Sequence, residues 1–242
     1  MPRMRIGIGL LALAAVLGVA RGWAQPPADL TATIDAIAAA ALEQPIAGLS
    51  IAVGRRGKPI ITRAYGRANI ERGVPVTPDT IFHIASISKN IEAAIALKLA
   101  EQGKLSLDED VRTYVPQAPT HGERVTPRQL LSHTSGLYNF TSLPEAQANE
   151  GRDWTHDQVF GLIQARPFDF APGTGWHYSN SGFYLAGVAI ERAAGASYAD
   201  YVRQAIFAPL GMQTASLCTV HDRVSNLASG YDAPKATLEP AP

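Results

Sequence analysis

The order of the expected elements predicts an α+β protein, in which strands and helices occupy separate parts of the chain. Residues 47–66 hold two β-rich runs around the turn-forming stretch "GRRGKP", a pattern typical of a β-hairpin. Helical patterns separated by loops follow as far as about residue 210, and no strand-like run returns after them. Because a two-stranded sheet is marginal alone, we expect the sheet of this sequence to be incomplete.

The expected helices are delimited by their apolar spacing and by residues that start or stop helices. Thr126 and Pro127 form a cap and first-turn pair, while Gly103, Gly195 and Pro209 follow or stop helical runs. On these criteria we expect helices over residues 28–44, 90–103, 126–133, 155–167, 181–195 and 197–209.

The first 24 residues are typical of a secretory signal peptide. Arg3 and Arg5 precede an apolar run over residues 6–20, and small residues at Gly22 and Ala24 predict cleavage before Gln25. The run is shorter than the ~20 residues of a membrane-spanning helix. We therefore expect an exported protein, periplasmic or secreted, without a membrane span after cleavage. The expected domains are the signal peptide over 1–24, a folded domain over 25–232 and a Pro-rich tail over 233–242.

Composition narrows the classes of partner. The chain has 242 residues, of which 46% are hydrophobic and 17% charged, and its formal net charge is zero. Such a chain is globular, and without a run of like charges it gives no reason to expect nucleic acid as a partner. The six histidines show no metal-ligand spacing, so we expect no metal and no cofactor. Cys218 is the only cysteine, and we expect it to lie in the core as a small apolar side chain.

The stretch "SISK" suggests nucleophilic catalysis. On a helix Ser86 and Lys89 lie on one face, so the lysine amine can reach the serine hydroxyl and serve as its base. Ser88 is adjacent to Lys89, so on a helix its side chain would point elsewhere. The alternative is a helix-capping serine followed by a solvated lysine, which the motif alone favours. A second motif, Tyr178-x-Asn180, changes that balance, because a tyrosine can relay a proton and an amide can orient a substrate or the lysine.

Other candidate groups are weaker. "GLSIA" around Ser50 lacks the second glycine of a nucleophile elbow. His133 in "SHTSG" is a possible triad base, but a histidine at a helix end with a local hydrogen bond is the favoured interpretation. Asp108 and Asp110 are expected to cap a short helix rather than to form a catalytic carboxylate pair.

Together, "SISK", "GKLSLDEDV", "LLSHTSGL", "APGTGWHYSNSGFYLAGVAIERAAG" and "APLGM" resemble the class C β-lactamase-like serine hydrolases, from about residue 30 to 232. That family includes class C β-lactamases, D-alanyl-D-alanine carboxypeptidases, D-aminopeptidases and related esterases. The resemblance implies a β-lactamase and penicillin-binding-protein-like fold, with an antiparallel sheet flanked by helices beside a helical domain.

The resemblance also implies an acyl-enzyme mechanism on a small-molecule or peptide substrate. Ser86 would attack a carbonyl group, Lys89 and Tyr178 would handle the protons, and Asn180 would help to position the substrate. Whether Lys89 or Tyr178 is the acylation base, and whether the bond belongs to a β-lactam, a D-amino acid peptide or an ester, stay open.

The chain departs from the family in one respect. Family members carry a third motif on a later strand, Lys or His, then another residue, then Gly, and no such motif follows Asn180. The expectation is therefore a C-terminally truncated domain. Two alternatives follow: a serine hydrolase, or an inactive remnant or subunit that needs another chain to complete its site.

Overall fold

The computed structural model describes residues 28–149, 151–219, 222–233 and 238–241. The predicted signal peptide and part of the predicted tail lie outside these ranges. The chain divides into two compact units: one comprises Met1–Pro78 with Ser229–Pro242, and the other Asp79–Ala228. We call them the hairpin unit and the helical unit, and describe each by itself.

The predicted hairpin is confirmed in the hairpin unit. Strand β1 (Gly48–Arg55) pairs antiparallel with β2 (Lys58–Asn69), and β3 (Val74–Pro75) pairs with the other edge of β2. The turn residues Arg56 and Gly57 have φ angles of 53° and 74°. A two-residue turn with both φ angles positive matches the right-handed twist of the strands it joins.

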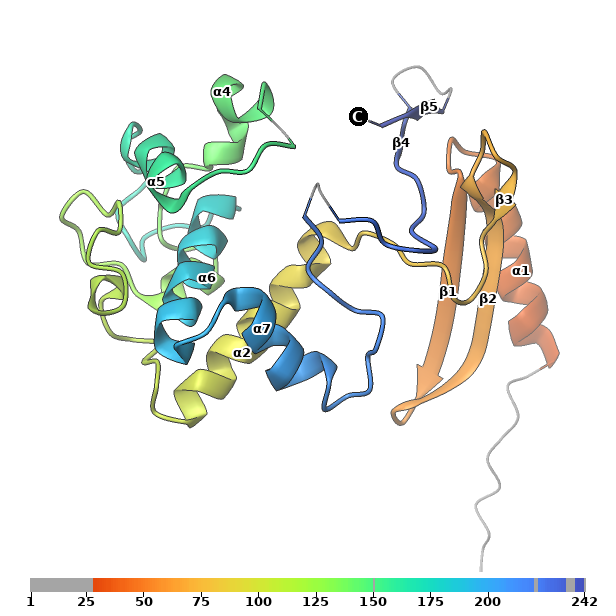
Figure 1. Ribbon diagram of the computed structural model, residues 1–242, viewed down its shortest axis with the longest axis horizontal. Helices are drawn as coiled ribbons and strands as arrows, with labels where there is room; N and C mark the ends of the chain where they lie inside the picture. The colour runs from red at the N-terminus through yellow and green to blue at the C-terminus, as the bar shows by residue number, and fades with distance from the viewer. Residues whose placement is uncertain (1–27, 150, 220–221, 234–237, 242) are drawn as a thin grey trace, which may run out of the picture. The chain divides into compact units, whose positions relative to one another are not determined.

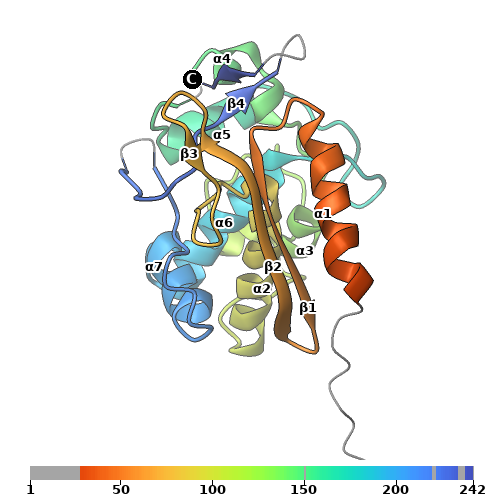
Figure 2. The same ribbon diagram turned by 90° about the vertical axis from the view of Figure 1, so that its right-hand side faces the viewer.

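Helix α1 (Ala28–Leu42) runs beside the hairpin (Figure 2) and contacts β2. Ile34 and Ala38 are its buried side chains, and the Tyr65 hydroxyl of β2 donates a hydrogen bond to Asp35. The helix that the apolar spacing predicts is therefore present, two residues shorter at its C-terminal end.

Two short strands also belong to the hairpin unit. Strand β4 (Tyr231–Asp232) pairs with β5 (Glu239–Pro240), so the expectation that no strand follows the helices was wrong here. The Tyr231 hydroxyl accepts from the Ile70 amide and donates to Glu71 at 2.6 Å. These contacts join residues about 160 positions apart, and a local sequence pattern carries no signal for them.

The helical unit consists of short helices joined by loops. Helix α2 packs beside α6 and α7, and these three elements lie side by side in Figure 1. The α-helices are α2 (Ser88–Glu101), α3 (Pro127–Leu131), α4 (Pro144–Gln147), α5 (His156–Gln164), α6 (Asn180–Ala194) and α7 (Tyr198–Val202). Residues Arg203–Phe207 continue α7 as a π-helix, where the sequence predicts one regular helix.

Local signals fix the ends of several of these helices. Thr126 and Thr155 each accept a hydrogen bond from the third backbone amide of their helix, and a glutamine returns the bond in both cases. Such capping boxes satisfy amides that the helix leaves unpaired. At the other end of α6, Gly195 has a φ of 68°, the left-handed conformation that favours glycine.

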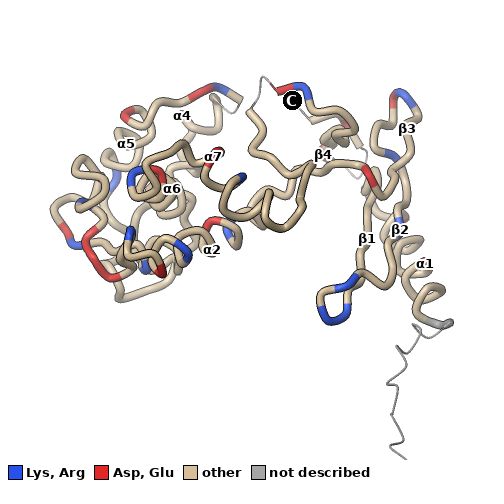
Figure 3. Tube along the Cα trace, turned by 60° about the horizontal axis from the view of Figure 1, so that its bottom comes forward, with Lys and Arg blue, Asp and Glu red and all other residues tan. Residues whose placement is uncertain are grey.

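The core of the helical unit is continuous. Ile95 and Leu99 of α2, Leu130 of α3, and Leu185 and Ile190 of α6 have no exposed surface. Such closely packed side chains hold the helix axes in fixed positions. The surface carries both signs of charge along the helical unit, while Arg55, Arg56 and Lys58 gather at the hairpin turn (Figure 3). Within the described residues, no helix is long and apolar enough to cross a membrane.

Candidate active site

Ser86 lies on a constrained turn directly before α2. Residues Ala85–Ile87 form a 3₁₀ turn, and Ala85 has a φ of 43°, which is unfavourable for a residue with a Cβ atom. No side-chain cap bond is made at the start of this turn or of α2. The capping alternative for Ser86 is therefore wrong. Its exposed hydroxyl instead contacts two side chains.

The two contacts of Ser86 are Tyr178 and Lys89. The Ser86 Oγ lies 2.6 Å from the Tyr178 hydroxyl and accepts a hydrogen bond from the Lys89 Nζ at 3.1 Å. The lysine is one turn along α2, at the spacing that places both side chains on one face. Tyr178 is 92 residues away in sequence, so only the packing of α6 against α2 brings it here.

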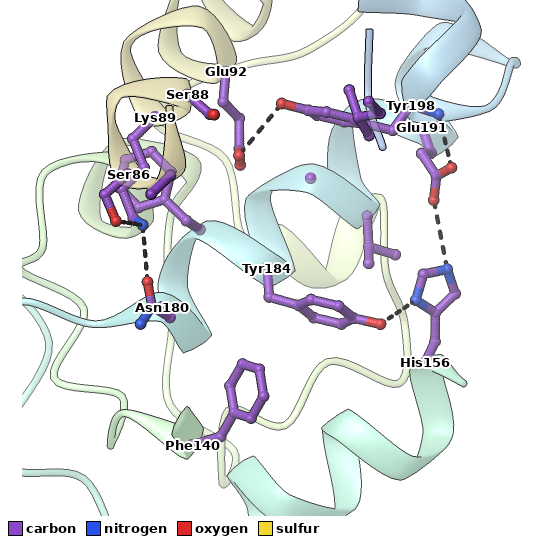
Figure 4. Close-up of a pocket in the computed structure, with 15 residues that line it drawn as sticks. Ser86, Ser88, Lys89, Glu92, Phe140, His156, Asn180, Tyr184, Glu191 and Tyr198 are labelled. Atoms are coloured by element: carbon purple, nitrogen blue, oxygen red, sulfur yellow. Dashed lines mark hydrogen bonds and ion pairs between the residues drawn. The ribbon is translucent and has the colours of Figure 1, made fainter. Parts of the chain in front are cut away.

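Lys89 contacts two side-chain oxygens and two aromatic rings. Its Nζ donates to the Asn180 Oδ1 at 2.8 Å as well as to Ser86 (Figure 4). It also lies 4.9 Å from the ring centre of Tyr178 and 5.3 Å from that of Phe183. An ammonium group over aromatic rings is attracted by their negative faces. The site thus concentrates positive charge beside the serine and tyrosine hydroxyls.

The N-terminus of α6 holds Tyr178 and Asn180 in place. Ser179 caps the helix by accepting from the Gly182 amide, so Tyr178 precedes the helix and Asn180 is its first residue. The Asn180 side chain donates through Nδ2 to Thr141 at 2.9 Å, and its backbone amide donates to Asn139 at 3.0 Å. These bonds orient the amide so that Oδ1 points at Lys89.

The environment shifts the pKa of Tyr178 downward. Burial opposes ionisation of the phenol, but the hydrogen bonds with Lys89 and Ser86 and the positive charge of Lys89 outweigh it. The pKa of Tyr178 therefore lies below that of an ordinary phenol. Such a tyrosine forms the phenolate, the form that can accept the proton of Ser86, more readily than a free tyrosine.

His133 supports Tyr178, a role that the sequence did not indicate. Its Nδ1 accepts the Ser179 amide hydrogen at 3.1 Å, and its ring lies 4.5 Å from the Tyr178 ring, centre to centre. The expected local hydrogen bond is therefore wrong, because the partner is 46 residues later. Burial and the charge of Lys89 lower the pKa of His133, which keeps Nδ1 free to accept. The sequence pointed to the motif "SHTSG" but gave no signal for the partner of His133, the Ser179 amide.

A pocket of about 550 Å³ opens beside Ser86 and Lys89. Its wall is mainly apolar and aromatic, and Figure 4 shows that its polar members include Glu92, His156, Glu191 and Tyr198. The volume falls within the range of small-molecule sites. Sequence analysis did not single out Glu92 or this pocket. How far one glutamate of a helix is buried depends on its tertiary neighbours, which a local pattern does not contain.

The remaining sequence candidates lie outside this group. Cys218 is exposed, so the expectation of a buried cysteine was wrong. Asp110 caps the short 3₁₀ helix Val111–Thr113 as predicted, whereas Asp108 pairs with Arg128 at 2.7 Å. Ser50 lies in β1 and donates to the Arg63 carbonyl at 3.5 Å. Among the described residues, no cluster of His, Cys, Asp or Glu could hold a metal ion.

Comparison with known proteins identifies the family of this chain. The Beta-lactamase family model matches residues 30–242. Esterase EstB of Burkholderia gladioli is 34% identical over 77% of this chain and 51% of its own length. Penicillin-binding protein 4* of Bacillus subtilis is 31% identical over 72% of this chain and 40% of its own. The chain thus spans about half the length of the curated relatives it matches.

Solved structures give the same result. A D-amino acid amidase from Ochrobactrum anthropi superimposes with a TM-score of 0.74 at 31% identity, covering 86% of this chain and 59% of its own. A class C beta lactamase has a TM-score of 0.73 at 32% identity, covering 88% and 57%. These matches bear out the predicted fold class and the resemblance. The chain belongs to the Beta-lactamase family.

Proposed function

We propose that this protein is a serine hydrolase that cleaves an ester, amide or β-lactam bond through an acyl-enzyme on Ser86. The observation that carries the proposal is the contact of one serine hydroxyl with both a tyrosine hydroxyl at 2.6 Å and a lysine amine at 3.1 Å. A serine hydroxyl becomes a strong nucleophile only when a neighbouring group takes its proton.

Between the two candidate bases, the contacts favour Tyr178. Lys89 donates to two oxygens and faces two aromatic rings, so these contacts hold its amine as a hydrogen-bond donor. The charge of Lys89 lowers the pKa of Tyr178. In the proposed step the Tyr178 phenolate takes the Ser86 proton while Oγ bonds to the substrate carbonyl carbon. Tyr178 then protonates the leaving group as the bond to it breaks. Water hydrolyses the resulting ester and restores Ser86.

A covalent label tests the nucleophile. Incubation with a fluorescent fluorophosphonate or penicillin should label the protein, and Ser86→Ala should abolish the adduct. Ser50→Ala is the matched control, because it removes the other candidate serine from a different unit. Labelling at a residue other than Ser86 would contradict the proposal. The alternative, a chain that needs another chain to complete its site, predicts no adduct until that chain is added.

Tyr178→Phe tests the base. We expect the labelling rate to fall by about 10²–10⁴-fold, which is the usual contribution of a general acid–base group. The fold and the Lys89–Asn180 hydrogen bond should survive, because the phenyl ring can keep its place against His133. A variant that labels at the wild-type rate would assign the proton transfer to Lys89.

The substrate and the location of the protein follow as part of the same proposal. A panel of a small ester, a D-amino acid amide and a penicillin would rank the bond types by kcat/KM. The N-terminal pattern supports export to the periplasm or the medium. Cell fractionation should recover a mature chain that begins at Gln25, and a chain that keeps residues 1–24 in the cytoplasm would contradict export.

A further inference from the structure

Glu92 is a half-buried residue in the wall of the pocket, one turn beyond Lys89 on α2 (Figure 4). Its Oε2 accepts from the Tyr198 hydroxyl at 3.4 Å. Its Oε1 is buried and has no hydrogen-bond partner among the described residues. A carboxylate held in this way lacks the donors that normally accompany a buried charge.

Among the residues that the structure describes, none forms an ion pair with Glu92. On α6, Glu191 accepts from the Tyr198 amide at 2.8 Å and lies 3.5 Å from the His156 Nε2 of α5. The other nitrogen of His156 contacts the Tyr184 hydroxyl at 2.7 Å. These three side chains therefore engage one another and Tyr198 of α7. Lys89, on the same helix as Glu92, is directed to Ser86 and Asn180.

This burial sets the charge of Glu92 at neutral pH. Desolvation raises the pKa of Glu92 to about 8, although the charge of Lys89 and the hydrogen bond from Tyr198 both lower it. Burial and the neighbouring Glu92 carboxyl also raise the pKa of Tyr198. The carboxyl is thus mostly protonated at pH 7, and it becomes an anion within one turn of Lys89 as the pH rises above its pKa.

We propose that Glu92 is a positioning residue that acts through Lys89. While Glu92 is protonated, the positive charge of Lys89 acts fully on Ser86 and Tyr178. When Glu92 is ionised, its negative charge partly offsets that of Lys89. The inference rests on the proposed function. Since the Lys89 charge lowers the pKa of Tyr178, an anion at Glu92 raises it again and reduces the fraction of phenolate available to Ser86. Ionisation of Glu92 is therefore expected to reduce the gain in nucleophile activation that the ionisation of Tyr178 brings as the pH rises.

The direct test is the titration of Tyr178, which needs no enzymatic activity. The Tyr178 contribution is the difference between the phenolate absorbance curves of a protein and of the same protein carrying Tyr178→Phe. We expect the midpoint to be lower in Glu92→Gln than in the wild type, because glutamine resembles the protonated carboxyl. Glu101→Gln, at the exposed end of the same helix, is the matched control and should leave the midpoint unchanged. Equal midpoints in wild type and Glu92→Gln would overturn the inference.

A second measurement follows the rate of fluorophosphonate labelling at about pH 7 and pH 9. With a pKa of about 8, most of Glu92 is ionised at pH 9, so the ratio of the rates at pH 9 and pH 7 should be higher in Glu92→Gln than in wild type. The ratio is taken within each variant, so a general loss of activity does not affect it. An unchanged ratio would overturn the inference, whereas a wild-type chain that never labels would overturn the proposed function and leave the Tyr178 titration to decide.

Discussion

The two units of the chain differ in the size of the buried apolar core that each forms. In the helical unit, the side chains of α2, α3 and α6 form one continuous buried core. In the hairpin unit, the buried apolar side chains among the described residues are fewer: Ile34, Ala38, Ile61, Ala68 and Val76. All four predicted site residues come from the helical unit. The comparison indicates that the site depends on a well-packed set of helices, and that the sheet contributes none of its four side chains.

The largest expected difference is between the stability costs of shortening a core side chain and of shortening a side chain on the sheet. Leu185→Ala removes a side chain with no exposed surface and should lower the free energy of unfolding of the helical unit by about 2–5 kcal/mol. Ile60→Ala, on the exposed part of β2, should change stability by less than about 0.5 kcal/mol. Denaturant titration measures both. A large loss of unfolding free energy in Ile60→Ala would mean that this face of the sheet is covered in solution, and it would contradict the expected difference between the two units.

Two glycines of the hairpin unit test how closely its backbone segments are packed. A Cβ atom on Gly66 would lie 2.4 Å from the Ala47 carbonyl oxygen, and its φ of 74° already disfavours alanine. Gly57 has the same φ but no atom within 4 Å of the added Cβ. We expect Gly57→Ala to cost about 1–2 kcal/mol and Gly66→Ala more. Hydrogen exchange of the β1 and β2 amides reports both, and equal protection would contradict the close approach.

A helix cap gives a smaller effect that should reach the site. Thr126 caps α3, and the chain leaves that helix just before His133, which supports Tyr178. Thr126→Ala should cost about 0.5–2 kcal/mol, and Thr126→Ser should restore most of it because the hydroxyl is kept. Amide exchange in α3 and the labelling rate of Ser86 would be measured together. If serine gave no rescue, the methyl packing of Thr126 rather than the cap would be responsible.

The smallest expected effect is a pH dependence of stability due to His133. Its folded pKa lies below the unfolded value, so the unfolded chain binds the proton first as the pH falls. The free energy of unfolding should therefore decline below about pH 6.5, the ordinary pKa of histidine. His133→Gln should flatten this decline, whereas His83→Gln, which replaces an exposed histidine, is the control. A decline that persists in His133→Gln would assign it to other groups.

Part of this structure could be predicted from the sequence, because the forces that decide it are local. The hairpin turn is formed within two residues that have positive φ angles. Thr126, Thr155 and Gly195 delimit helices through bonds within a few residues. The Ser86-to-Lys89 spacing is local in the same sense, since one helical turn sets it.

Other features were decided only when distant segments packed together. Tyr178 reaches Ser86 across 92 residues, and His133 finds its amide partner 46 residues later. The exposure of Cys218, the π-helical end of α7 and the burial of Glu92 likewise depend on neighbours that no short pattern contains. The sequence alone determined which groups could carry chemistry and how each local turn forms. The tertiary structure decided which hydroxyl faces Ser86 and how its neighbours are charged, because desolvation and hydrogen bonding act through space rather than along the chain.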